Sequence, residues 1–363
     1  MTQTVQIGAL IFAFAVAAGV AALATPVVSR LARALQVVDR PAARKVNVRP
    51  DIPLLGGIAV ALGFFVGLSA AILLTGDELR FAGHMEALLI GGILVVGLGA
   101  WDDRSPLPAR PKLLLQLAAA GVAIFYGFRI AYLTDPVTHT HWFLPGWLMV
   151  LCSTLWIVGI TNAMNLMDGL DGLCAGVGVI IGATLTIICW QGGEWVGVYF
   201  GVALMGALLG FLPFNFAPAR IFLGDTGALF IGYALSLLAL EGYRQLSLLT
   251  FLVPLLALAV PLLDTGLSVL RRLRRRAPIF SADRYHMHHR LLHFQGSQRS
   301  AVLSIYFLTA CFCVIALSFT NLHGFVSIVV VAVVILLTFR LLRNLGFFEV
   351  EAEDEPHGAE GRR

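Results

Sequence analysis

Charged side chains are scarce in this 363-residue chain. Lys, Arg, Asp and Glu together make up 13% of it, whereas hydrophobic residues make up 58%. Such a composition excludes a soluble globular protein and predicts a polytopic integral membrane protein. The formal net charge of +4 is that of a polarised membrane protein and gives no indication of nucleic-acid binding.

Lys and Arg are absent before Arg30, so the first apolar stretch lacks the basic region that opens a cleaved signal peptide. Basic residues follow the stretch instead. This polarity is typical of a retained first helix whose N-terminus lies outside the cytoplasm, here in the periplasm.

Cysteine is also rare, and no pair has the C-x-x-C spacing of a metal or redox site. All five cysteines fall in apolar stretches, where packing is the expected role and a metal centre or disulfide is disfavoured. They are Cys152, Cys174, Cys189, Cys311 and Cys313.

Long apolar stretches recur along the chain, each close to the length that crosses a bilayer as a helix. We predict an all-α fold with about eleven transmembrane helices. The predicted spans are 6–28, 54–74, 86–101, 113–132, 146–162, 174–190, 196–213, 226–242, 247–268, 300–320 and 324–341.

The distribution of basic residues predicts the orientation of these spans. With the N-terminus in the periplasm, the loops at 30–53, 102–112, 163–173, 214–225 and 270–299 and the C-terminus are cytoplasmic. Of the 25 Lys and Arg residues, only Arg80, Arg129 and Arg244 then lie outside. This asymmetry follows the positive-inside rule and supports both the number of spans and their orientation.

We expect a single polytopic domain over residues 1–348. The remaining segment, 349–363, is rich in acidic residues and is predicted to be a disordered cytoplasmic tail. Its acidic residues are Glu349, Glu351, Glu353, Asp354 and Glu355.

The segment 162–173 reads N-A-M-N-L-M-D-G-L-D-G-L and places Asn165, Asp168 and Asp171 three residues apart. If the segment is helical, these side chains project near one face. An ionisable group beside a membrane span is costly, so the cluster is a candidate functional site.

Adjacent carboxylates, Asp102 and Asp103, end the third predicted span, and Lys112 precedes the fourth. Neighbouring carboxylates point in different directions, so one can bind a metal or position a phosphate while the other orients or deprotonates. The alternative is an aspartate pair solvated at the membrane interface.

The segment from Asn215 to Gly227 leads into the eighth predicted span, with Asp225 between two glycines. Because glycine lets the backbone turn and approach closely, this carboxylate can lie near a divalent cation. The alternative is simple N-capping of the following helix by Asp225 or Thr226.

The loop after the ninth span contains the cluster Tyr285-His286-Met287-His288-His289-Arg290. Zinc would need a fourth ligand, often Cys, and the predicted cytoplasmic loops contain none. We therefore expect binding of an anionic substrate, with Arg290 able to contact a phosphate with two hydrogen bonds.

The first cytoplasmic loop adds further cations, including Lys45. The predicted cytoplasmic face thus combines carboxylates for a divalent metal with Arg, Lys and His for phosphates. These are the requirements of phosphoryl transfer, where electrostatic positioning supplies most of the catalysis. A site at the membrane implies that one substrate is a lipid.

At this point the chain resembles a known family, the polyprenyl-phosphate N-acetylhexosamine-1-phosphate transferases. The resemblance rests on four segments that occur in the family's order. They are W-D-D-R at 101–104, N-A-M-N-L-M-D-G-L-D-G-L at 162–173, P-A-R-I-F-L-G-D-T-G at 218–227 and H-M-H-H-R-L at 286–291. The last form resembles the branch that uses UDP-N-acetylglucosamine, whereas the branch that uses UDP-N-acetylmuramoyl-pentapeptide tends to carry consecutive histidines there.

The resemblance implies transfer of a sugar 1-phosphate from a UDP-sugar to undecaprenyl phosphate, with release of UMP and a need for Mg²⁺, or Mn²⁺ in its place. It implies metal binding by Asp225 and Asn165. Catalytic roles fall to Asp102, Asp103, Asp168 and Asp171. Substrate contacts fall to Lys45, Lys112, Asn165, Asn215, His286, His288, His289 and Arg290.

One position departs from the family pattern. Members often read R-K-x-H in the first loop, and this chain reads Arg44-Lys45-Val46-Asn47. Asn47 can still hydrogen-bond to a substrate. The sequence leaves open whether the protein is a homodimer.

The expected mechanism is one in-line attack by the lipid phosphate on the β-phosphorus of the UDP-sugar, with Asp102 orienting or deprotonating the acceptor. A two-step route through an aspartyl-phosphate uses the same residues. Two other classes remain as alternatives: an intramembrane aspartyl protease, and a proton-coupled transporter, whose acidic groups should lie near mid-bilayer.

Overall fold

A computed structural model describes residues 3–39, 51–76, 83–134, 140–243, 248–274, 287, 290–292 and 296–319, and a few single positions beyond them. The chain divides into two compact units, Met1–Asn321 and Leu322–Arg363, and the helices and strands below belong to the first. The predicted tail at 349–363 lies outside the described residues, as do Lys45, Asn47, His286, His288 and His289.

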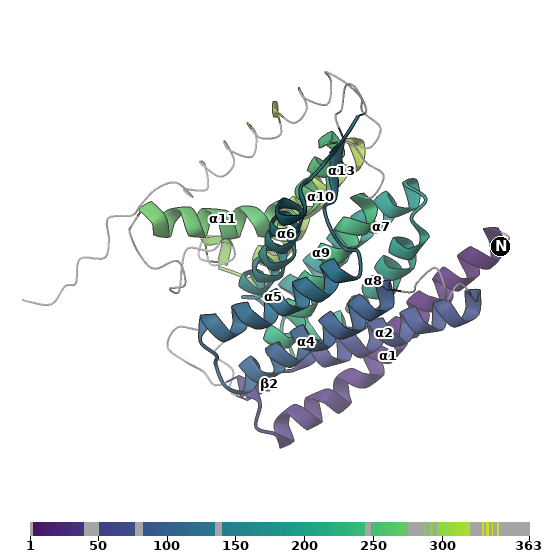
Figure 1. Ribbon diagram of the computed structural model, residues 1–363. Helices are drawn as coiled ribbons and strands as arrows, with labels where there is room; N and C mark the ends of the chain where they lie inside the picture. Colours follow the sequence, from purple (N-terminus) through teal and green to yellow (C-terminus); the bar gives the residue numbers. More distant parts are fainter. Residues whose placement is uncertain are drawn as a thin grey trace, which may run out of the picture. The chain divides into compact units, whose positions relative to one another are not determined.

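The first unit is a bundle of long helices with two small antiparallel strand pairs (Figure 1). In chain order its elements are α1 (Gln3–Ala34), β1 (Val38–Asp39), β2 (Ile52–Pro53), α2 (Gly56–Thr75), α4 (His84–Arg104), α5 (Ala109–Phe125), β3 (Tyr132–Thr134), β4 (His141–Phe143), α6 (Gly146–Met167), α7 (Leu173–Gln191), α8 (Trp195–Asn215), α9 (Gly224–Tyr243), α10 (Leu248–Ala257), α11 (Ala259–Arg274) and α13 (Gln298–Phe319).

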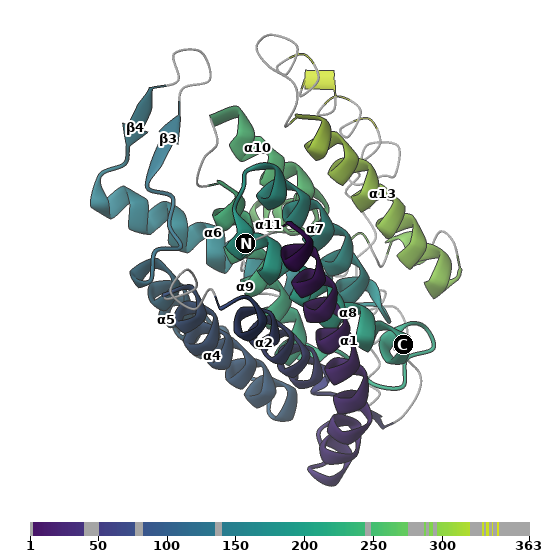
Figure 2. The same cartoon turned by 90° about the vertical axis from the view of Figure 1, so that its right-hand side faces the viewer.

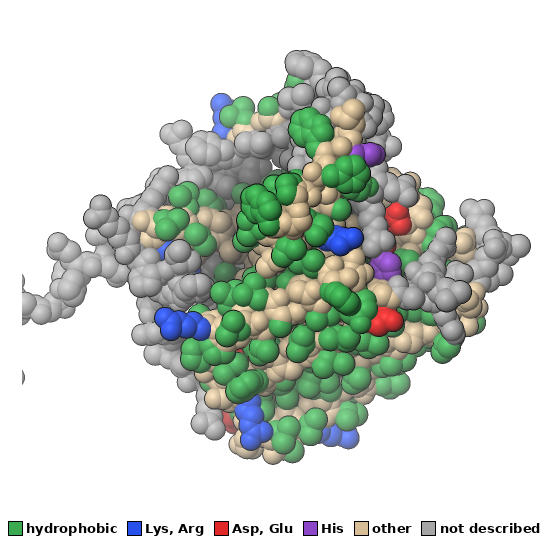
Figure 3. Space-filling model, viewed as in Figure 1, with side chains coloured by type: hydrophobic (Ala, Val, Ile, Leu, Met, Phe, Trp, Pro, Cys, Tyr) green, Lys and Arg blue, Asp and Glu red, His purple; other side chains and the backbone are tan. Residues whose placement is uncertain are grey.

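Seven of the described helices are long and apolar enough to cross a membrane: α1, α2, α4, α6, α7, α8 and α13. The described surface in Figure 3 is correspondingly covered by hydrophobic side chains, with few charges. The prediction of a helical, multi-pass membrane protein is therefore confirmed, whereas the number eleven and the orientation stay predictions.

The predicted span 113–132 is wrong in its last seven residues, 126–132. Helix α5 ends at Phe125, and Gly127 has a φ of 104°, a left-handed conformation that suits glycine and ends the helix. The chain then enters β3 at Tyr132, which pairs with Phe143 of β4. The segment 126–132 was apolar enough to be read as a continuation of the helix.

The predicted span 247–268 is also corrected, because two helices, α10 and α11, cover it with a break at Leu258. Pro261 has no backbone N–H and its ring clashes with the carbonyl four residues earlier, that of Ala257. The thiol of Cys313 lies 3.8 Å from this carbonyl oxygen and replaces part of the lost hydrogen bond.

Helix α9 lies inside the bundle and packs against α2, α4, α6 and α7. Almost all of its side chains are buried. Two hydrogen bonds fix it to its neighbours: Tyr233 donates to the Ala87 carbonyl of α4 at 3.0 Å, and the Trp156 indole of α6 donates to the Ser236 carbonyl at 3.1 Å. Because α9 packs against four helices, the side chains of its first turn are held in a fixed position.

Helices α4 and α9 meet most closely at the start of α9. A Cβ added to Gly99 would lie 2.3 Å from the Cα of Thr226, so only glycine permits this approach. The close contact brings the end of α4, with Asp102 and Asp103, beside the beginning of α9, with Asp225.

The loop before α9 is anchored to the segment before α2. Phe222 donates its N–H to the Pro53 carbonyl at 2.9 Å, and Gly56 and Gly57 donate to the carbonyls of Phe222 and Leu223 at 3.0 and 2.9 Å. This small set of backbone bonds extends the β1–β2 pair, in which Val38 faces Pro53. These bonds fix the start of α9 relative to the start of α2.

The C-terminal ends of α4 and α6 lie beside the N-terminal ends of α5 and α9. Side-chain hydrogen bonds between residues near these four ends connect the helices. The β3–β4 hairpin joins the end of α5 to the start of α6 and so lies at the opposite end of the bundle (Figure 2). The Asp and Lys side chains of the four helix ends and the β3–β4 hairpin thus lie at opposite ends of the bundle.

Candidate functional site at the ends of α4, α5, α6 and α9

The polar residues of 162–173 do not form one helical face. Helix α6 ends at Met167, Asp168 follows as its C-cap, and Asp171 lies in a turn before α7. The expectation that Asn165, Asp168 and Asp171 share a helix is therefore wrong. Gly172 adopts a φ of 79° at the N-cap of α7, so the next helix begins only after this turn.

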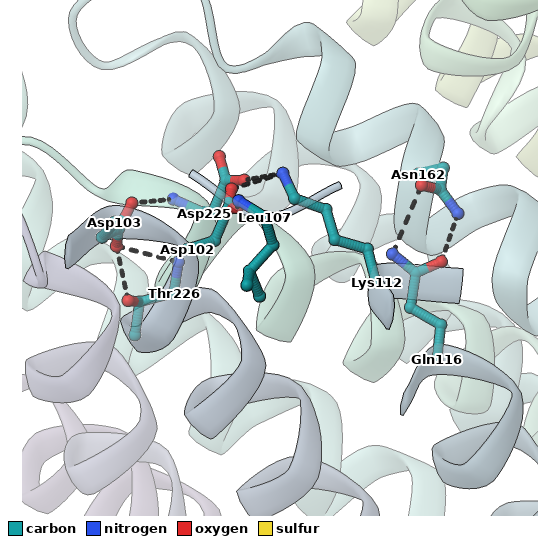
Figure 4. Close-up of polar contacts among 8 residues, drawn as sticks. All are labelled: Asp102, Asp103, Leu107, Lys112, Gln116, Asn162, Asp225 and Thr226. Carbon is teal, nitrogen blue, oxygen red and sulfur yellow. Dashed lines mark hydrogen bonds and ion pairs between the residues drawn. The ribbon is translucent and has the colours of Figure 1, made fainter. Parts of the chain in front are cut away.

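Asp103 caps helix α9 from another helix. Its carboxylate accepts the backbone N–H groups of Asp225 at 2.8 Å and Thr226 at 3.2 Å, and the Thr226 hydroxyl at 2.5 Å (Figure 4). These are the N–H groups that a helix leaves unsatisfied at its start. Neither Asp225 nor Thr226 acts as the cap, and both oxygens of Asp103 are engaged in positioning.

Gly224 makes this cap sterically feasible. Its φ is 72°, and a Cβ at this position would lie 2.4 Å from Oδ2 of Asp103. A side chain would both strain the backbone and displace the carboxylate. The glycine before Asp225 therefore serves the cap directly.

Lys112 connects the two other carboxylates of the site. Its ammonium forms an ion pair with Oδ2 of Asp102 and another with Oδ2 of Asp225 at 3.1 Å. Oδ1 of Asp102 accepts the backbone N–H of Leu107 at 2.6 Å. Figure 4 shows Asp102, Lys112 and Asp225 converging from α4, α5 and α9.

The charges of this cluster affect one another. Burial raises the pKa of Asp225, and the hydrogen bond with Asp102 raises it further, to about 7. Burial alone would lower the pKa of Lys112, but the two carboxylates outweigh it and the pKa is raised. Lys112 thus stays protonated, while Asp225 titrates near neutral pH.

Asp168 adds a further acidic group close to the cluster. Burial raises its pKa well above the usual value, and the negative charges of Asp225, Asp103 and Asp171 act in the same direction. Asp171 itself accepts the backbone N–H of Ala219 at 2.9 Å, which ties the turn after α6 to the loop before α9. The site therefore gathers several acidic groups, and their mutual repulsion favours the protonated form of Asp168.

Two predicted amides carry buried atoms without a hydrogen-bond partner. They are Nδ2 of Asn165 and Oδ1 of Asn215, whereas Nδ2 of Asn215 donates to the Ile221 carbonyl at 3.1 Å. A buried polar atom without a partner costs about 1–3 kcal/mol, so such atoms are suited to a ligand. Asn165 lies one turn before Asp168.

A pair of amides was not selected from the sequence. Gln116 of α5 and Asn162 of α6 bond reciprocally, with Nδ2 of Asn162 donating to Oε1 of Gln116 at 2.6 Å and Nε2 of Gln116 donating back at 3.3 Å. Gln116 follows Lys112 by one helical turn and is 4% exposed. The sequence does contain a signal for this pair, because Gln116 is a polar residue inside a predicted span, one helical turn after Lys112.

Asp264 of α11 was not selected from the sequence, and it is buried in the structure. Its Oδ1 accepts the backbone N–H of Met287 at 2.7 Å. Arg290 is described and partly exposed, while the three histidines of the cluster lie outside the described residues. Their predicted substrate contacts stay predictions, as do those of Lys45 and Asn47.

The donor set suits a hard divalent cation such as Mg²⁺. Within the described residues no group of three or more His, Cys, Asp or Glu side chains could hold a metal. Mg²⁺ does not require one, since it keeps several waters and is held by one or two carboxylates plus substrate phosphates. Asp225 offers such an oxygen donor, and the predicted metal role of Asn165 stays a prediction.

The helical membrane fold and its acidic, lysine-containing site define the class of protein. A model of Glycosyl transferase family 4 matches residues 85–243, the part of the chain that contains Asp102 to Asp225. The chain belongs to this family, and the expectation drawn from the four segments is confirmed.

Several curated relatives cover most of the chain. A "Probable undecaprenyl-phosphate N-acetylglucosaminyl 1-phosphate transferase" of Bacillus subtilis is 36% identical over 90% of this chain and 89% of its own. A "Decaprenyl-phosphate N-acetylglucosaminephosphotransferase" of Mycobacterium tuberculosis is 36% identical over 78% and 76%. A "Phospho-N-acetylmuramoyl-pentapeptide-transferase" of Shouchella clausii is 35% identical over 66% and 76%.

Proposed function

We propose that this protein transfers N-acetylglucosamine 1-phosphate from UDP-N-acetylglucosamine to undecaprenyl phosphate at the cytoplasmic face of the bacterial cytoplasmic membrane. The products are a lipid-linked pyrophosphoryl sugar, which begins a cell-envelope glycan, and UMP. The convergence of Asp102, Lys112 and Asp225 at one end of a membrane bundle carries the proposal. It combines a cation for phosphate with carboxylates for a metal where a lipid headgroup can reach them.

The choice of sugar rests on the relatives. The two named for N-acetylglucosamine transfer match a larger share of this chain than the one named for phospho-N-acetylmuramoyl-pentapeptide, 90% and 78% against 66%. The H-x-H-H form at 286–289 favours the same substrate. The muramoyl-pentapeptide substrate is the second candidate.

The geometry gives less support to the other classes. An aspartyl protease needs two carboxylates that share a proton. Asp102 and Asp225 are hydrogen-bonded to each other, but both are also ion-paired with Lys112, a cation suited to binding phosphate. A proton-coupled transporter places its acidic groups near mid-bilayer. The acidic groups of this site lie at helix ends.

In the reaction, an oxygen of the lipid phosphate attacks the β-phosphorus of the UDP-sugar. The bond from that phosphorus to the bridging oxygen breaks, and UMP leaves with the bond's electron pair. Asp102 lies next to Lys112 and can orient the acceptor, while the Lys112 ammonium can contact a phosphate oxygen. Both carboxylate oxygens of Asp103 already accept hydrogen bonds from the first turn of α9. Asp102 is therefore favoured over Asp103 as the group that acts on the substrate.

Mg²⁺, when bound, would neutralise charge on the pyrophosphate and so lower the barrier to attack. Asp225 would hold the ion, because its side chain is 31% exposed and it lies in the first turn of α9, whose backbone is fixed. Asn165 would add an amide oxygen.

A radiolabel assay with membranes that contain the protein tests the proposal. We expect label from UDP-N-acetylglucosamine to enter a butanol-extractable lipid when the label is in the sugar or the β-phosphate, and UMP, not UDP, to be released. Release of UDP would contradict phosphosugar transfer. Membranes with Asp225→Asn serve as the matched control.

The same assay tests orientation. UDP-sugars do not cross bilayers, so inverted vesicles should react at once, whereas right-side-out vesicles should react only after permeabilisation. Full activity in sealed right-side-out vesicles would place the site on the periplasmic face.

A further inference from the structure

The β3–β4 hairpin carries large aromatic side chains on the end of the bundle away from the site (Figure 2). Trp142 is 59% exposed and Phe143 is 75% exposed. The strands themselves, Tyr132–Thr134 and His141–Phe143, contain no Asp, Glu, Lys or Arg. Exposed aromatic area without charge needs a partner that is not bulk water.

The register places aromatic rings on both faces of this two-stranded ribbon. Residues directly opposite each other share a face, and neighbours along a strand alternate. Tyr132 is opposite Phe143 with ring centroids 5.7 Å apart, and Leu133 is opposite Trp142. Phe143 and Trp142 therefore project from opposite faces.

From this arrangement we infer that the hairpin is embedded in the headgroup region of the lipid bilayer and anchors the bundle there. A docked protein, including a second copy of this chain, would cover one face of the ribbon and leave the other in water. Lipid covers both faces at once. Trp and Tyr also concentrate at the headgroup level because their rings are apolar and carry one polar group.

The neighbouring helix ends support the same environment. Phe125, at the end of α5, is 81% exposed, and Trp147, in the first turn of α6, is 68% exposed. The apolar surface of α6 continues from Trp147 to Leu155, which is 64% exposed within a helix long enough to cross the membrane. The hairpin is thus continuous with a lipid-facing surface. An isolated two-stranded hairpin is marginal in water, and lipid contact would stabilise it.

Photocrosslinking in native membranes tests this inference without depending on the transferase reaction. The photoreactive aromatic p-benzoylphenylalanine replaces Trp142 or Phe143, one at a time, in the full chain. Leu155 replaced in the same way is the positive control for lipid contact. After irradiation, mass spectrometry identifies what is attached.

We expect adducts heavier by one phospholipid at both positions of the hairpin, as at Leu155. An adduct with a second copy of the chain or with another polypeptide at either position would overturn the inference. So would the absence of lipid adducts at 142 and 143 when Leu155 gives them.

A second measurement needs no unnatural residue. Brominated lipids quench tryptophan fluorescence over short distances, so Trp142→Phe in liposomes should remove a quenchable part of the emission. If Trp142 lies in water, the part removed would instead be quenched by iodide and not by the lipids. That result would also overturn the inference.

Discussion

Asp103 holds Asp225 in place: its carboxylate accepts the backbone N–H of Asp225 at 2.8 Å, across the contact between α4 and α9. One acidic residue is thereby used to fix the backbone of another, whose side chain faces Lys112. The two adjacent aspartates of α4 have separate tasks as a result. Asp102 and Asp225 both form ion pairs with Lys112, whereas Asp103 caps the start of helix α9.

Substitution of the two aspartates should separate these tasks. Asp103→Ala removes an N-cap with three hydrogen bonds, so it should lower stability by about 1–2 kcal/mol and also abolish activity. Asp102→Ala should abolish activity with a smaller change in thermal stability. Unfolding temperatures in detergent, measured beside the radiolabel assay, check this. Equal destabilisation by the two variants would contradict the separate roles.

Gly224→Ala should reduce both stability and activity, because Gly224 has a φ of 72° and its Cβ would meet Asp103. Strain of this kind costs about 1–3 kcal/mol. Gly97→Ala in α4 is the matched control, since no atom lies within 4 Å of its added Cβ. The control should retain wild-type activity. A wild-type unfolding temperature for Gly224→Ala would argue against the cap.

Asp225→Asn should reduce turnover by orders of magnitude while the protein still inserts into the membrane. The amide loses the charge that a divalent cation requires, and excess EDTA should have the same effect on the wild type. Glu86→Gln, a change of the same type at the far end of α4, should keep activity. Full activity in EDTA would refute the metal role of Asp225.

Activity at subsaturating Mg²⁺ should fall as pH drops below about 7, because protonated Asp225 cannot bind a cation and its pKa is about 7. Lys112→Met removes a positive charge that lowers this pKa, so the acidic limb should move to higher pH. Arg110→Met, an exposed cation on the same helix, should leave the limb in place. The pH profile of kcat/KM measures both. An unchanged limb in Lys112→Met would show that Asp225 does not set it.

The amides of Gln116 and Asn162 should behave as a unit. Asn162→Leu leaves the buried amide of Gln116 unsatisfied, at a cost of about 1–3 kcal/mol. Gln116→Leu should cost less, because Asn162 is only half-buried and still donates to the Val158 carbonyl at 2.8 Å. The double variant should cost less than the sum, with a coupling of about 0.5–3 kcal/mol. Unfolding free energies of the wild type, both single variants and the double variant complete the cycle. Strict additivity would indicate that the 2.6 Å bond contributes little.

The sequence predicted the membrane class and most residues of the site, because charge is so costly in apolar surroundings that Asp102, Lys112 and Asp225 stand out. It did not predict that Asp103 caps α9, since that bond joins residues 122 positions apart and has no local pattern. The end of α6 at Met167 was missed because spacing by three suggested a helix. There the chain turns between Asp168 and Gly172, which has a φ of 79° at the start of α7.

Helix α9 also sets the depth of the chemistry. Its two acidic residues, Asp225 and Glu241, lie in its first and last turns, and a rise of 1.5 Å per residue separates them by about 24 Å. Glu241 lies 3.5 Å from His84 at the other end of the bundle. This separation is about 6 Å shorter than a hydrocarbon layer of about 30 Å, so each carboxylate of an upright helix lies close to one boundary of the layer. A lipid phosphate can meet Asp225 at headgroup level, so its chain need not leave the bilayer.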